Sequence, residues 1–244
     1  MLRTVLWFLS AVIICILLIP IGLIGFILRI NGLKMAKLAC SLFLKWVYGA
    51  AGFKLEKHGM ENIPDGPALF VGNHQGLFDT IIAINDVGGP KSIVAKKEAE
   101  KIPVIHLWMK VFMECIFIDR GNIRASLKAM QQVEEHLKNG KSVLIFPEGH
   151  RSKCSEVKEF HGGSLKPAIK AGVPIVPFVI NGSYKAWDEK HRITPCRTTL
   201  TILPPIETKN LEGVKTKELA EEIRQQIQAV IDRENAGKGA ESNE

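Results

Sequence analysis

The chain is organised around a stretch in which a short apolar run passes into polar residues, Ala68-Leu69-Phe70-Val71-Gly72-Asn73-His74-Gln75-Gly76-Leu77-Phe78-Asp79. An apolar run of this length that ends in turn-forming residues predicts a buried strand. The residues that follow predict a helix over Phe78–Asn85. A buried strand, a turn and a helix in this order are typical of proteins in which helices cover a largely parallel sheet.

The same alternation continues along the chain after Gly52, where short apolar runs separate longer amphipathic ones. The predicted strands are Phe53–Glu56, Ala68–Val71, Ser92–Ala95, Ile116–Ile118, Val143–Phe146, Ile175–Ile180 and Thr198–Leu203. The further predicted helices are Ile123–Leu137, Ser164–Ala171 and Thr216–Asp232. These elements predict an α/β fold with a mixed, largely parallel sheet flanked by helices.

Three regions differ in composition. Residues 1–51 predict a helical membrane anchor, residues 52–235 form the predicted main domain, and the polar tail 236–244 is expected to be disordered. The formal net charge is +7, and residues 1–50 contain five basic residues and no acidic one. Positive charge beside an apolar segment favours an anionic membrane surface as partner over nucleic acid, which usually binds a basic patch on the folded domain.

The apolar part of the anchor runs from Val5 to Leu28 without a charge. As one helix at about 1.5 Å per residue it would reach about 36 Å, enough to cross a bilayer core. It lacks the small-residue cleavage site of a signal peptide. Pro20 can kink such a helix, and Leu33–Val47 is amphipathic and basic. The sequence leaves open one span followed by an interfacial helix, or a helical hairpin within one leaflet. The basic residues after the run predict a main domain on the cytoplasmic face.

His74 and Asp79 are the first candidate catalytic residues. On a helix, side chains five positions apart point about 140° apart, but across a strand end, a flexible turn at Gly76 and the start of a helix they can meet. A carboxylate that holds an imidazole fixes its tautomer and stabilises the imidazolium, so that the histidine can act as a general base. Without a nucleophile motif nearby, the base is expected to act on a substrate hydroxyl in a direct transfer. In the alternative, His74 caps the turn and Asp79 caps the helix.

A second polar block follows the predicted strand at 143–146 and reads Phe146-Pro147-Glu148-Gly149-His150-Arg151-Ser152. It lies at the carboxyl end of a strand, where α/β sheets usually bind ligands. The planar fork of Arg151 suits phosphate, and Gly149 lets the backbone approach a ligand. Glu148 can orient the arginine or bind a substrate hydroxyl.

A third block, Phe117-Ile118-Asp119-Arg120, is another strand end and supplies a second arginine. We expect Arg120 and Arg151 to lie at neighbouring strand ends around an anionic group. Each of them can also be an ordinary surface cation. The five cysteines are odd in number and never in C-x-x-C spacing, which argues against a disulfide framework and a structural zinc site. No metal or cofactor is expected.

Taken in order, these blocks resemble the glycerolipid acyltransferase family, and within it the 1-acyl-glycerol-3-phosphate acyltransferases of the PlsC type. The family blocks N-H-x-x-x-x-D, F-I-D-R, F-P-E-G-x-R-S and V-P-I-V-P correspond to Asn73–Asp79, Phe117–Arg120, Phe146–Ser152 and Val173–Pro177. The match spans residues 52–205. It departs from the family at His150, where threonine is most frequent, and at His161, where a basic residue is more frequent.

The resemblance implies transfer of a fatty acyl group from acyl-CoA or an acyl-carrier protein to the 2-hydroxyl of lysophosphatidate at the membrane surface, which gives phosphatidate. It implies that His74 is the base and that Asp79 orients it. The residues implied to hold the glycerol phosphate are Arg120, Glu148, Gly149 and Arg151. The alternatives are an acyltransferase that acts on glycerol 3-phosphate or another lysophospholipid, a thioesterase that uses the same pair on water, and a non-catalytic membrane adaptor.

Overall fold

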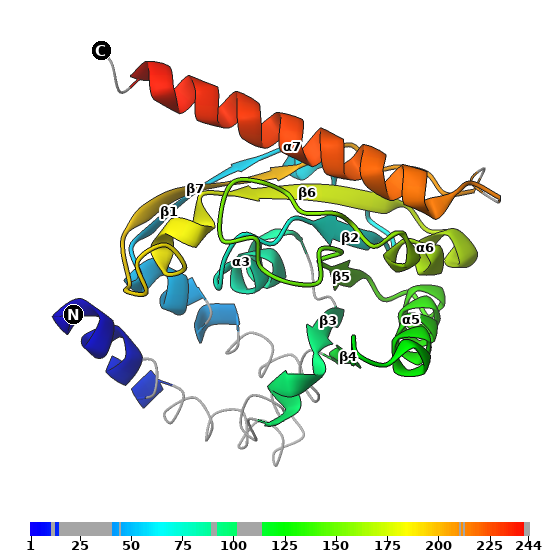
Figure 1. Cartoon of the computed structure of the whole chain (residues 1–244), viewed down its shortest axis with the longest axis horizontal. Helices are drawn as coiled ribbons and strands as arrows, with labels where there is room; N and C mark the ends of the chain where they lie inside the picture. The colour runs from blue at the N-terminus through cyan, green and yellow to red at the C-terminus, as the bar shows by residue number, and fades with distance from the viewer. Residues whose placement is uncertain are drawn as a thin grey trace.

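The computed structural model describes residues 1–10, 13–14, 41–43, 45–88, 92–101, 114–209, 211 and 213–241. Within them, one seven-stranded sheet has the strand order β1-β7-β6-β2-β5-β3-β4 (Figure 1). Its strands are β1 (Phe53–His58), β2 (Leu69–Gly72), β3 (Ser92–Lys96), β4 (Ile116–Ile118), β5 (Val143–Ile145), β6 (Ile175–Asn181) and β7 (Cys196–Ile202). β7 is antiparallel to β6, and the other neighbouring pairs of described strands are parallel. The prediction of a mixed, largely parallel sheet is confirmed.

Helices cover both faces of this sheet. α5 (Ile123–Lys138), α6 (Lys166–Ala171) and α7 (Thr216–Glu241) contribute to the apolar core on one face. α3 (Asp79–Asp86) and the helical residues 45–50 contribute to the core on the other face. In Figure 1, α7 lies along β6, and α3 lies on the opposite side of the sheet.

The central strand β2 shows why the quoted apolar run forms this sheet. Leu69 and Val71 belong to the core under α5 and α7, whereas Phe70 belongs to the core on the α3 face. All three are buried, because a strand covered by helices on both sides has no solvent-facing residue. A continuous apolar run is the consequence.

The predicted strands agree with the observed ones to within two residues at each end. In the described part of the chain, four 3-10 turns were not predicted, namely η1 (Met60–Asn62), η2 (Lys97–Lys101), η3 (Gly162–Ser164) and η4 (Ser183–Ala186). α6 therefore begins at Lys166, two residues later than predicted, because η3 occupies the preceding turn. Gly172 follows α6 with φ 65°, the left-handed conformation that glycine adopts readily after the C-terminus of a helix.

The last helix is longer than predicted. α7 extends to Glu241, so residues 236–241, which were expected to belong to a disordered tail, are helical. The stripe of Leu219, Ile223, Ile227 and Ile231 is buried on the domain and anchors the helix. Once a helix is anchored, each added residue contributes a further hydrogen bond without a new nucleation step, which explains the extension.

The N-terminal region is helical over residues 2–10 and 13–14, and its first turns pack on the main domain. The indole N–H of Trp7 donates to the carbonyl of Val47 at 2.8 Å. The ring centroids of Trp7 and Phe78 lie 5.8 Å apart. In the part of the chain that the structure describes, no helix is long and apolar enough to cross a membrane. Most of the predicted spans 5–28 and 33–47 lies outside the described residues.

Candidate active site

The candidate site lies where three central strands end. β2 has β5 and β6 as its parallel neighbours, with Val71 opposite Ile145 and Gly72 opposite Phe178. The carboxyl ends of parallel neighbours meet at one edge of the sheet. The segments that follow these strands, 73–79, 146–152 and 182–183, are therefore brought together.

His74 and Asp79 meet as predicted. His74 Nδ1 lies 2.9 Å from Oδ2 of Asp79, the first residue of α3. The Asp79 side chain is fully buried, whereas that of His74 is 18% exposed. Because an ionised carboxylate can only accept hydrogen bonds, the imidazole proton lies on Nδ1. The second ring nitrogen, Nε2, is then the one that can accept a proton.

The Asp79 carboxylate has two further hydrogen-bond donors. The Gly76 N–H donates to Oδ2 at 2.7 Å, and the hydroxyl of Ser183 donates to Oδ1. Ser183 is fully buried at the start of η4, just after β6. Ser183 was not predicted from the sequence, because a single serine more than a hundred positions away from Asp79 forms no recognisable pattern with it.

Gly76 is required for close packing rather than for a flexible turn. A Cβ at this position would lie 2.9 Å from Cα of Tyr184 and 3.1 Å from the carbonyl carbon of Ser183. Its φ is not positive. The glycine therefore lets the loop after β2 pack against the backbone after β6, which brings Ser183 within reach of Asp79.

The loop that carries His74 is fixed by backbone and amide hydrogen bonds. The side chain of Asn73 accepts from the N–H of Ile180 and donates to its carbonyl, both at 2.9 Å. Gln75 Oε1 accepts from the Gly182 N–H at 2.9 Å, and the His74 carbonyl accepts from the Ser152 N–H at 2.8 Å. Rigid support of this kind holds a catalytic side chain in one position.

Glu148 supports the same loop. Its Oε1 accepts from the backbone N–H of His74 at 2.6 Å, and its Oε2 accepts from the N–H of Lys158 at 3.1 Å. Burial raises the pKa of Glu148 to about 7, although the two backbone donors act in the opposite direction. The expectation that Glu148 orients the arginine is not what the geometry shows, because both of its oxygens bind backbone.

Gly149 and Arg120 lie side by side. Gly149 has φ 77°, which a side chain would strain, and a Cβ built on it would lie 3.6 Å from the guanidinium carbon of Arg120. The expectation that Arg120 and Arg151 lie at neighbouring strand ends was wrong, since β3 separates β4 from β5. Arg120 nevertheless reaches the block after β5.

Arg151 forms an ion pair instead of pointing freely into solvent. Its Nη1 lies 2.8 Å from Oδ1 of Asp188, a buried carboxylate whose Oδ2 accepts from the N–H of Leu77 at 2.8 Å. Arg151 thus stabilises the loop between His74 and Asp79. Its side chain is one-third exposed, so some of its other donors face solvent. Asp188 was not predicted from the sequence as a site residue.

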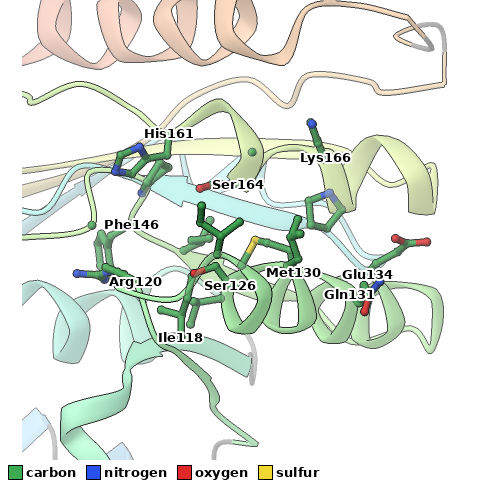
Figure 2. Close-up of a pocket in the computed structure, with 18 of the residues that line it drawn as sticks. Ile118, Arg120, Ser126, Met130, Gln131, Glu134, Phe146, His161, Ser164 and Lys166 are labelled. Carbon is green, nitrogen blue, oxygen red and sulfur yellow. The ribbon is translucent and has the colours of Figure 1, made fainter.

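An apolar cavity of about 480 Å³ lies beside this edge of the sheet (Figure 2). Figure 2 shows its walls, with Met130 of α5 on one side, Ser164 of η3 on another, and Ile118 and Phe146 from the strand ends. The ring of Phe146 stacks on the His74 imidazole, with centroids 4.4 Å apart and planes inclined by 21°. The cavity wall therefore contacts the candidate base. His161, one of the departures from the family pattern, lines the same cavity.

Comparisons with known proteins identify the family to which the chain is similar. A family model described as Acyltransferase matches residues 54–181. A probable 1-acyl-sn-glycerol-3-phosphate acyltransferase of Mycoplasma pneumoniae is 33% identical over 145 residues, which cover 58% of this chain and 54% of the relative. A 1-acyl-sn-glycerol-3-phosphate acyltransferase of Pseudomonas aeruginosa is 35% identical over 136 residues, or 55% and 52% of the two chains. The chain thus spans about half the length of the curated relatives it matches.

A solved structure extends the similarity to nearly the whole chain. It is the crystal structure of the 1-acyl-sn-glycerophosphate acyltransferase PlsC from Thermotoga maritima, with a TM-score of 0.81 and 27% identity over 96% of this chain and 97% of that one. The family model alone covers more than half of the 244 residues and includes His74, Asp79 and the block after β5. On these findings, the chain belongs to the acyltransferase family.

Proposed function

We propose that this protein transfers a fatty acyl group from an acyl thioester to the free 2-hydroxyl of 1-acyl-glycerol-3-phosphate, giving phosphatidate. The observation that carries the proposal is the His74–Asp79 pair, held at 2.9 Å with Asp79 fully buried, next to an apolar cavity. The printed names of the relatives, which are 1-acyl-sn-glycerol-3-phosphate acyltransferases, support the choice of acceptor.

In the proposed reaction, His74 Nε2 removes the proton of the acceptor hydroxyl while the hydroxyl oxygen attacks the thioester carbonyl carbon. The new carbon–oxygen bond forms and the carbon–sulfur bond breaks. His74 then gives its proton to the departing sulfur, which leaves as a thiol. Asp79 stabilises the transient imidazolium through the bond to Nδ1. A positioned base of this kind contributes about 10²–10⁴-fold in rate.

The acceptor phosphate is proposed to bind beside this pair. Arg120 is exposed next to Gly149, whose positive φ turns the chain directly after Glu148. Arg151 contributes the guanidinium donors that do not face Asp188. Glu148 acts indirectly, because its Oε1 holds the backbone N–H of His74 and its Oε2 that of Lys158. An arginine fork binds phosphate with matching geometry, which supports these cations as the anion site.

The membrane is the proposed source of the acceptor. The described N-terminal helix packs on the domain through Trp7, while Leu2, Leu6 and Leu9 are each more than half exposed. An exposed apolar helix face of this kind binds lipid surfaces. We propose that residues 1–51 anchor the main domain to the cytoplasmic face of the membrane. The apolar cavity beside Phe146 is proposed to receive the fatty acyl chain.

The test is an acceptor-dependence assay on the detergent-purified full chain. Release of thiol is measured from an acyl-CoA and separately from an acyl-carrier protein, with lysophosphatidate, with glycerol 3-phosphate, with a neutral-headgroup lysophospholipid, and without acceptor. We expect release with lysophosphatidate and formation of phosphatidate by mass spectrometry. Equal release without acceptor would identify a thioesterase, preference for another acceptor would change the substrate, and inactivity with all of them would favour an adaptor.

A further inference from the structure

We propose that Ser183 is a positioning residue for the reaction: its hydroxyl fixes the Asp79 carboxylate so that Oδ2 faces His74. The proposal rests on the proposed role of His74 as the base. It concerns a residue outside the blocks that carry the family resemblance. Ser183 lies two positions after the end of β6, the strand that pairs with β2.

The hydrogen-bond donors around Asp79 are divided between its two oxygens. Oδ2 lies 2.9 Å from His74 Nδ1 and accepts from the Gly76 N–H at 2.7 Å, whereas Oδ1 accepts from the Ser183 hydroxyl. A carboxylate rotates readily about its bond to Cβ, since this torsion has a broad energy profile. With Ser183 bound to Oδ1, rotation would break that hydrogen bond inside a fully buried site, where an unsatisfied acceptor is costly. Ser183 therefore opposes the motion that would move Oδ2 away from His74.

The position of Ser183 is itself fixed. Gly182 before it has φ 97° and donates its N–H to Gln75 of the His74 loop at 2.9 Å. Gly76 packs so closely against this segment that a Cβ would lie 3.1 Å from the Ser183 carbonyl carbon. The hydroxyl carries one hydrogen, and its bond to Oδ1 uses it. The geometry is that of a donor built to hold one carboxylate oxygen.

The test compares Ser183→Ala and Ser183→Cys, each alone and combined with Asp79→Asn. Ser92→Ala is the matched control, since it also deletes a buried hydroxyl. The Ser92 hydroxyl lies 2.8 Å from His136 Nδ1, in a part of the domain away from the site. We expect Ser183→Ala to lower kcat about 10- to 100-fold, because a displacement of about 1 Å in a catalytic group costs on the order of 10²-fold. KM for either substrate should change less than twofold. Ser183→Cys, which keeps a weak donor of similar size, should recover part of kcat.

The double variant separates positioning from general loss of structure. If Ser183 acts through Asp79, Ser183→Ala should lower kcat less than twofold further in the Asp79→Asn background. A full additional loss, or a kcat within twofold of wild type for a folded Ser183→Ala, overturns the proposal. If Ser183→Ala does not fold, the same comparison is made with Ser183→Cys.

A substrate-free measurement separates failure of this proposal from failure of the proposed function. Proton NMR of the full chain in detergent should show the His74 Nδ1–H signal, assigned by its disappearance in His74→Ala. We expect Ser183→Ala, but not Ser92→Ala, to shift or broaden it. An unchanged signal overturns the role of Ser183. A shifted signal in a chain that transfers acyl groups to no acceptor overturns the proposed function and leaves Ser183 as the residue that orients Asp79.

Discussion

Glu148→Gln should remove a pH dependence of stability that a single buried carboxyl creates. Glu148 is 1% exposed, and its burial raises the pKa from 4.5 to about 7. Between these two pH values the folded state binds a proton that the unfolded state has released. Stability therefore falls as pH rises through this window and levels off above it.

The size of the effect follows from the shift. One pKa unit corresponds to about 1.4 kcal/mol, so a change from 4.5 to about 7 corresponds to about 3 kcal/mol of unfolding free energy lost between pH 4.5 and 8. Glutamine has the same shape and can still accept the His74 N–H, but it does not titrate. Its free energy of unfolding should lack this component.

The assay is urea unfolding of the full chain and the variant at half-unit steps from pH 4.5 to 8. The free energy of unfolding of the wild type, relative to that of the variant, should fall by about 3 kcal/mol between pH 4.5 and pH 8. Glu207→Gln, which changes an exposed carboxyl, is the matched control and should follow the wild type. A difference in unfolding free energy between Glu148→Gln and wild type that stays constant with pH would show that Glu148 does not titrate with a raised pKa in the folded protein.

Three further substitutions test the loop and the anion site. Gly76→Ala should destabilise the protein by about 1–3 kcal/mol, because its Cβ would press on the backbone of Ser183; an unchanged thermal midpoint would contradict this. Asn73→Ala should cost about 2–4 kcal/mol in urea unfolding, since it leaves the N–H and carbonyl of Ile180 without their partner. Arg120→Gln should raise KM for a phosphate-bearing acceptor about 10-fold or more while the unfolding midpoint stays the same, as lost charge-assisted hydrogen bonds predict; an unchanged KM would exclude Arg120 from the anion site.

The sheet and the pair at its edge could be predicted because both are encoded by neighbouring residues. The run Leu69–Val71 is apolar because helices cover both of its faces, and that signal needs no knowledge of the partner strands. His74 and Asp79 are separated by one turn, so a strand end followed by a helix is enough to bring them together.

The remaining features depend on contacts between distant parts of the chain. Ser183 lies more than a hundred positions from Asp79, and Asp188 lies more than a hundred positions from Leu77 and 37 positions from Arg151. An isolated serine or aspartate has no distinguishing pattern. The partner of Arg151 was missed for this reason, and the role of Gly76 was misjudged because the backbone that it contacts follows β6. The order of the strands was equally inaccessible, so Arg120 and Arg151 were placed one strand too close.

The most direct test of the central claim is the effect of His74→Ala on acceptor-dependent acyl transfer. The control is His58→Ala, which changes an exposed histidine on β1. Urea unfolding of both variants tests whether the domain remains folded. We expect His74→Ala to lower kcat about 10²–10⁴-fold, the contribution of a positioned general base, and His58→Ala to leave kcat unchanged. Transfer by a folded His74→Ala chain at a rate within tenfold of wild type would contradict this expectation.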